Sequence, residues 1–113
     1  MHELSIMDSA LRMAVQYAEE HQATRIHRIT MRIGDVSGVA IEALTFAFEV
    51  LSPETQAEGV ELIIERVPAR CWCAQCGQEF EPTSPIFECP RCGTLSRKLL
   101  QGREMELASM EVS

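Results

Sequence analysis

Two cysteine doublets carry the clearest chemistry in this chain, Cys73-Ala-Gln-Cys76 and Cys89-Pro-Arg-Cys92. Each doublet is followed by a glycine, and twelve residues separate the two. Two CxxC elements joined by a short loop can bring four thiolates to the corners of a tetrahedron, the arrangement that Zn²⁺ prefers. A glycine after the second cysteine lets the backbone turn back, so that amides point at the sulfurs. The spacing therefore predicts a zinc site at Cys73, Cys76, Cys89 and Cys92.

A site of four thiolates is closed, because it leaves no position for water or substrate. The predicted zinc is therefore structural and not catalytic. The rival is an iron site of the rubredoxin type, which also uses Cys-Pro-x-Cys-Gly. Rubredoxins separate their two doublets much more widely than the twelve residues found here, which disfavours iron. Cys71 lies outside the doublets and is interpreted as a bystander, although it could replace Cys73 in another ligand set.

The first three residues, Met1, His2 and Glu3, form a second and subtler candidate site. A bulky second residue protects the initiator methionine, so Met1 should keep a free α-amine beside His2. The amine, the His2 amide nitrogen and the imidazole can form fused chelate rings, with the Glu3 amide or carboxylate as a further donor. Planar nitrogen donors favour Ni²⁺ or Cu²⁺ over Zn²⁺. Taken alone, however, a histidine at position 2 is more often accidental than a ligand.

Composition narrows the class of protein. The 113 residues carry a net charge of −7, which disfavours nucleic acid as a partner. No apolar run is long enough to span a membrane and no signal peptide is evident, so five cysteines indicate metal binding in a reducing, cytoplasmic compartment. The glutamates are scattered along the chain, as is typical of the solvent-exposed faces of helices and strands. No combination of residues typical of a catalytic site is present. An enzyme is therefore not expected.

The elements that must position these sites follow from hydrophobic periodicity. Apolar residues at helical spacing predict helices over residues 4–22 and 41–51, the second ending at Ser52-Pro53. Strict alternation predicts strands over 28–33 and 60–65. In the tail, Met105 and Leu107 share one parity whereas Met110 and Val112 share the other, so a strand there needs a bulge near Ala108-Ser109.

These elements predict an α+β fold in which a small sheet of about three strands packs with two helices. Pro68 marks a change of character, because residues 68–102 hold all the cysteines and little else to build a core. We therefore expect an α+β domain made of residues 1–67 and 103–113, with residues 68–102 inserted as a zinc-ribbon-like module, called here the cysteine module. Closing the zinc site supplies on the order of 10 kcal/mol to such a module.

The whole pattern resembles the hydrogenase/urease nickel-insertion accessory protein family. The likeness rests on the Met1-His2-Glu3 start, the order of helices and strands, and the inserted pair of doublets. Arg32-Ile33-Gly34 at the end of the first strand and the Gly102-x-Glu104-Met105 opening of the last strand also fit. The Met-His-Glu start is the specific element, since paired CxxC doublets occur in many families.

The resemblance implies a small metallochaperone that binds Ni²⁺ through Met1, His2 and Glu3 and delivers it to a hydrogenase large subunit. It also implies a nickel-handling maturation GTPase as partner, with urease maturation proteins as further candidates and zinc as a purely structural ion. Either a monomer or a homodimer fits the sequence. The competing interpretation is a zinc ribbon that binds proteins or nucleic acid and has no role in nickel handling.

Overall fold

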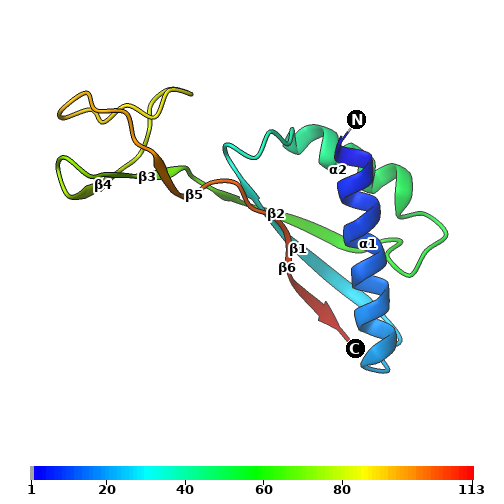
Figure 1. Ribbon diagram of the computed structural model, residues 1–113. Helices are drawn as coiled ribbons and strands as arrows, with labels where there is room; N and C mark the ends of the chain where they lie inside the picture. The colour runs from blue at the N-terminus through cyan, green and yellow to red at the C-terminus, as the bar shows by residue number, and fades with distance from the viewer. Residues whose placement is uncertain (1) are drawn as a thin grey trace.

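The computed structural model describes the backbone of residues 2–113 and the side chains of residues 3–113. It is an elongated α+β molecule of about 54 × 27 × 17 Å, with two three-stranded sheets placed one after the other along its length (Figure 1). The elements in chain order are α1 (His2–Glu20), β1 (Ile26–Gly34), α2 (Ile41–Leu51), β2 (Glu61–Val67), β3 (Arg70–Cys73), β4 (Gln78–Phe80), β5 (Lys98–Gln101) and β6 (Met105–Val112). The predicted fold class is confirmed. None of the helices in this described part of the chain has the length and apolarity needed to cross a membrane.

The first sheet has the strand order β2-β1-β6, with β1 parallel to β2 and antiparallel to β6. Alternate side chains of a strand point to opposite faces, and Ile29, Met31 and Ile33 of β1 are each only 1% exposed. These three belong to one apolar cluster with residues of both helices, such as Met7 of α1 and Leu44 of α2. The alternation read from the sequence is therefore confirmed, and both helices cover the same face of this sheet (Figure 1).

The bulge expected in the tail is present in β6. Thr30 of β1 pairs with Ser109 whereas its neighbour Met31 pairs with Leu107, so Ala108 is the extra residue. A bulge of one residue reverses the parity of the side chains that follow it. Leu107 and Met110 can therefore both pack against the core, although three residues separate them in sequence.

The opposite face of the first sheet is charged. Arg28 of β1 lies between Glu61 of β2 and Glu111 of β6, and it forms an ion pair with each. Arg32 is placed in the same way between Glu65 and Glu106. Exposed pairs of this kind contribute little to stability, because water screens them. They join both edge strands to β1 on the solvent-facing side of the sheet.

The second sheet has the strand order β4-β3-β5 and belongs to the cysteine module. Its strands span three or four residues each, which is too short for periodicity to reveal, and the sequence analysis named none of them. Its small apolar cluster consists largely of the cysteines themselves, together with Phe80, Phe87 and Leu99. An apolar cluster this small is too little to stabilise a sheet alone.

The two sheets meet at a close contact of two backbone segments. The N–H of Gly34 donates to Glu104 O at 2.8 Å, and the N–H of Val36 donates to Gly102 O at 2.8 Å. A Cβ at Gly34 would overlap the carbonyl group of Gly102, so only glycine fits there. The end of β1 is therefore clamped to the segment through which the chain returns from the second sheet.

Candidate metal centres

The structure brings the four predicted cysteine ligands together. The sulfur atoms of Cys73, Cys76, Cys89 and Cys92 all lie within 4.8 Å of one another. Cys73 Sγ lies 3.5 Å from Cys92 Sγ, and Cys76 Sγ lies 3.9 Å from Cys89 Sγ. A tetrahedron with Zn–S bonds of about 2.3 Å has edges of about 3.8 Å. The sulfur positions therefore fit a tetrahedral ion such as Zn²⁺.

Each cysteine doublet folds into the same turn. The N–H of Gly77 donates to Cys73 O at 2.8 Å, and the N–H of Gly93 donates to Cys89 O at 2.9 Å. Both glycines adopt a left-handed backbone, with φ of 64° and 75°, which explains why glycine follows each doublet. In the first turn the N–H of Cys76 also donates to Cys73 Sγ at 3.4 Å. A pair of matching turns thus points both doublets at one centre.

The four cysteines differ in their surroundings. Cys73 and Cys89 are buried, Cys76 is half-buried and Cys92 is exposed. Cys92 Sγ lies 3.2 Å from Thr94 Oγ1, and this hydrogen bond stabilises the thiolate and lowers the pKa of Cys92 to about 6. The contact of Cys76 with Cys92 raises the pKa of Cys76 to about 12. The thiol of Cys92 therefore loses its proton more readily than that of Cys76 before a metal binds.

Replacing Thr94 by valine is expected to shift the loss of zinc to higher pH. The hydroxyl of Thr94 favours the thiolate of Cys92, so its removal raises the pKa of Cys92 and lets protons compete with the metal sooner during acidification. The measurement is zinc release followed with a chromophoric chelator from pH 7 to pH 3. The Thr83→Val variant is the matched control. If zinc release from Thr94→Val had the same pH midpoint as release from the wild type, the Thr94 hydroxyl would not stabilise the Cys92 thiolate.

Cys71 is the fifth cysteine and its sulfur is not part of the cluster. Its side chain is fully buried, and this desolvation raises the pKa of its thiol. It packs with Phe80 and Leu99 in the apolar cluster of the second sheet. Its geometry is that of a core residue, in agreement with the interpretation of Cys71 as a bystander.

The candidate nickel site falls partly outside the described residues. Met1 and the side chain of His2 are not described, whereas the backbone of His2 begins α1. The predicted helix began two residues later, so the structure places His2 and Glu3 inside the first helical turn. The start of α1 lies beside α2, away from the strands β3 and β4 of the second sheet (Figure 1).

Glu3 makes a contact that the sequence did not reveal. Its carboxylate accepts a hydrogen bond of 3.2 Å from the N–H of Ala40, the residue that precedes α2. In a capping box the N–H of the N-cap residue is accepted by a Glu or Gln side chain of the same helix, and here Glu3 takes that part from another element. A negative charge is also favourable at the positive end of the α2 dipole. Glu3 therefore ties the beginning of α1 to the beginning of α2.

Replacing Glu3 by alanine is expected to lower the free energy of unfolding by about 1 kcal/mol, the usual net contribution of one hydrogen bond with a favourable charge at a helix start. The Glu3→Gln variant keeps an oxygen acceptor and should lose less than half of that amount. Urea denaturation followed by circular dichroism at 222 nm measures both changes. Equal losses in the two variants would show that the cap depends on charge alone.

Within residues 3–113, the cysteine cluster is the one group of histidine, cysteine and carboxylate side chains that could hold a metal ion. His21 stacks on Tyr17, with ring centroids 4.1 Å apart, and its Nδ1 lies 2.9 Å from the carbonyl oxygen of Tyr17. His27 Nε2 lies 2.7 Å from the hydroxyl of Ser113. Both histidines thus have partners within the protein.

The sequence of this chain is similar to those of one known protein family. The family model described as hydrogenase/urease nickel incorporation metallochaperone, hypA, matches residues 1–112. A curated hydrogenase maturation factor HypA from a Picosynechococcus species is 50% identical over 112 residues, covering 99% of each chain. The factor of the same name from Chloroflexus aurantiacus is 40% identical over 112 residues, covering 98% of each chain.

Solved structures show the same likeness in three dimensions. The solution structure of the Ni metallochaperone HypA from Helicobacter pylori superposes with a TM-score of 0.69 at 27% identity, covering 97% of this chain and 96% of that one. A second solution structure, of a HypA protein, gives a TM-score of 0.71 at 27% identity and covers 100% and 97% of the two chains.

Proposed function

This chain belongs to the HypA family of hydrogenase/urease nickel-incorporation metallochaperones, and we propose that it binds Ni²⁺ at its own N-terminus and delivers the ion to a hydrogenase large subunit. The observation that carries this proposal is the family match over residues 1–112, which includes the Met1-His2-Glu3 start. Nickel is the cargo here and zinc is a structural part of the carrier.

The beginning of α1 suits a site that holds a metal loosely. We propose the Met1 amine, the His2 imidazole and Glu3 as the protein donors. The backbone N–H groups of a first helical turn have no acceptor within the helix, so the amides of His2 and Glu3 can approach a metal without breaking helical hydrogen bonds. The positive end of the α1 dipole opposes a bound cation. These effects together support a modest affinity, which a carrier needs in order to release its ion.

Protons should compete with nickel in the range where histidine titrates. The imidazole and the amine bind a metal only after they lose a proton, so nickel affinity falls as the pH drops through that range. A closed thiolate site should keep its zinc to lower pH. A carrier built in this way can lose its cargo without losing its fold.

The cysteine cluster is proposed as a structural zinc site held by Cys73, Cys76, Cys89 and Cys92. Four thiolates fill the coordination of Zn²⁺ and give the cysteine module the stability that its few apolar side chains cannot supply. A site of four thiolates leaves no position for a substrate, and it is the one group among residues 3–113 that could hold a metal ion. We therefore propose that the chain is a carrier and not an enzyme.

The proposed partners follow from membership of the family. They are a nickel-handling maturation GTPase and the hydrogenase large subunit that receives the ion. Urease maturation proteins are further candidates. We place this exchange in the cytoplasm. The chain acts as a monomer or a homodimer in this proposal, and nucleic acid is not a partner.

The test of delivery is the nickel content of hydrogenase in cells that lack the resident HypA-family protein. We expect the untagged chain to restore nickel in the purified large subunit, whereas the His2→Ala variant does not. Both proteins must be present at equal levels and carry equal zinc. Restoration by the variant at ordinary nickel supply would contradict delivery from the N-terminus.

A further inference from the structure

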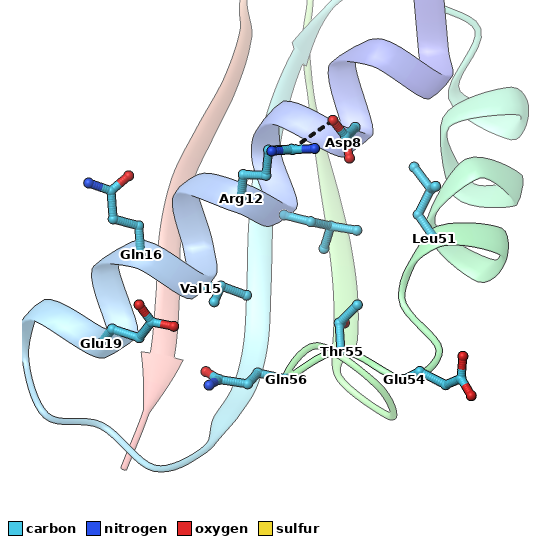
Figure 2. A pocket seen from close by; sticks show the side chains of 10 residues that line it. Asp8, Arg12, Val15, Gln16, Glu19, Leu51, Glu54, Thr55 and Gln56 are labelled. Atoms are coloured by element: carbon cyan, nitrogen blue, oxygen red, sulfur yellow. Dashed lines mark hydrogen bonds and ion pairs between the residues drawn. The ribbon is translucent and has the colours of Figure 1, made fainter.

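An open groove runs between α1 and the end of α2, on the side of the molecule shown in Figure 2. It has a volume of about 550 Å³, and the turn that follows α2 closes one end of it. It is lined by residues of α1, by Leu51 and by residues 54–56. The groove does not contain any of the proposed ligands for nickel or zinc.

The floor of the groove is aliphatic. Leu11, Val15 and Leu51 line it, and Figure 2 shows Val15 and Leu51 directed into the space between the two helices. Leu11 is 7% exposed and part of the core, whereas Val15 and Leu51 are only partly buried and pack at its margin. These two side chains therefore keep apolar surface in contact with water, which an apolar partner would remove.

The rim of the groove is acidic. Glu19 stands on α1 on one side, and Glu54 stands on the turn at the other (Figure 2). Both are exposed, and neither lies in a salt bridge among the described residues. Asp8 also lines the groove, but Arg12 neutralises it through an ion pair of 2.9 Å. The rim thus carries two uncompensated negative charges beside an aliphatic floor.

Glu54 occupies a backbone conformation that glutamate rarely adopts. Its φ is +65°, in the left-handed region where glycine or asparagine is favoured. The turn holds it there because the N–H of Glu54 donates to the Glu58 carboxylate at 2.8 Å. The hydroxyl of Thr55 donates to Ser52 O at 2.6 Å and accepts from the N–H of Ala57 at 3.0 Å. A carboxylate is thus kept on a strained but well-supported turn at the groove mouth.

We propose that this groove docks an amphipathic helix of a partner protein, one that presents aliphatic side chains to Val15 and Leu51 and places Lys or Arg beside Glu19 and Glu54. A groove between helices accepts a helix through apolar anchors at i, i+3 and i+4. Charge complementarity selects the basic class of partner, because acidic segments meet the same rim with repulsion. The supported turn keeps the site formed before binding, which reduces the ordering cost. The docking site is independent of the nickel proposal.

The test uses the zinc-loaded full chain, labelled with ¹⁵N, and a synthetic helical peptide of about 14 residues that has leucine on one face and lysine on the other. The matched peptide carries glutamate in place of lysine. We expect the lysine peptide to shift the amide signals of Val15, Leu51 and Gln56, and the glutamate peptide to leave them unchanged. Shifts that map mainly to another surface, or to none, would overturn the proposal.

Two double variants with equal net charge separate docking from general attraction to an acidic protein. Glu19→Lys with Glu54→Lys reverses the groove rim. Glu49→Lys with Glu81→Lys reverses two exposed charges that do not line the groove. Glu49 lies about 200° around α2 from Leu51, because the two are two residues apart in the helix. In 0.15 M salt we expect the rim variant to bind the lysine peptide about tenfold more weakly and the control less than threefold. Equal losses in the two variants would overturn the proposal.

A third variant, Glu54→Gly, removes the carboxylate and relieves the backbone at once. We expect it to raise the melting temperature and still to weaken binding of the lysine peptide. Because it does not depend on a destabilised fold, this variant keeps the proposal testable if the charge reversals impair folding. Unchanged affinity of Glu54→Gly for the lysine peptide would overturn the proposal. It would also be overturned if the groove signals of the protein alone shifted with protein concentration, because the groove would then bind a second copy of the chain.

Discussion

Replacing His2 by alanine is expected to abolish nickel binding while the zinc content stays at one equivalent per chain. The substitution removes the imidazole, which is both a strong donor for Ni²⁺ and a member of the fused chelate rings. The remaining amine and carboxylate should bind nickel at least about 100-fold more weakly. Isothermal titration of untagged protein with Ni²⁺, together with metal analysis of the same sample, measures both quantities.

His21→Ala is the matched control for that result. His21 is exposed near the end of the same helix and stacks on Tyr17, so it shares the chemistry of His2 but not its neighbouring amine. We expect this variant to bind nickel like the wild type. If His2→Ala bound nickel with unchanged affinity, or if His21→Ala lost as much affinity, then the nickel would be held elsewhere.

Removing zinc is expected to unfold the second sheet and to leave the first sheet folded. In the proposed zinc site, metal binding contributes on the order of 10 kcal/mol, and the few apolar side chains of the cysteine module offer no comparable stabilisation. The first sheet has its own apolar cluster, built from α1, α2 and β1, and none of the cysteines belongs to it. After chelation, amide signals of β3, β4 and β5 should collapse to random-coil positions while those of Ile29 and Leu44 persist.

Two cysteine variants sharpen this experiment. Cys76→Ala removes one proposed ligand and should reproduce the effect of chelation, whereas Cys71→Ala removes a buried thiol outside the cluster and should keep one zinc per chain. A zinc-free protein whose second sheet kept its amide dispersion would contradict a structural role for the metal. Loss of zinc from Cys71→Ala would place Cys71 in the ligand set.

Sequence alone predicts those parts of the fold that repeat a pattern over several turns or several residues. Ile29, Met31 and Ile33 alternate strictly, and their strand is the centre of the first sheet. The change of parity between Leu107 and Met110 predicted a bulge, and the bulge lies at Ala108. The CxxC-Gly spacing predicted which sulfurs come together, because a short turn leaves the chain little freedom there.

Contacts between distant segments left no such pattern. The hydrogen bond from Ala40 to the Glu3 carboxylate joins two helices through one backbone N–H, and no local signal in the sequence marks it. The strands of the second sheet are too short to show alternation. Likewise, the left-handed backbone of Glu54 is imposed by its turn and not by its own preference. The division of the chain at residues 68 and 102 stays a prediction, which the zinc-removal experiment tests.

A nickel titration of the untagged protein, before and after acetylation of its N-terminus, tests the central claim most directly. Acetylation removes the basicity of the terminal nitrogen and leaves every other side chain unchanged. The chain's single lysine, Lys98, is blocked in both samples so that it does not differ between them. We predict one equivalent of Ni²⁺ bound by the free terminus, none bound after acetylation, and one zinc retained in both. Stoichiometric nickel uptake by the acetylated protein would contradict a carrier that holds its cargo at the start of α1.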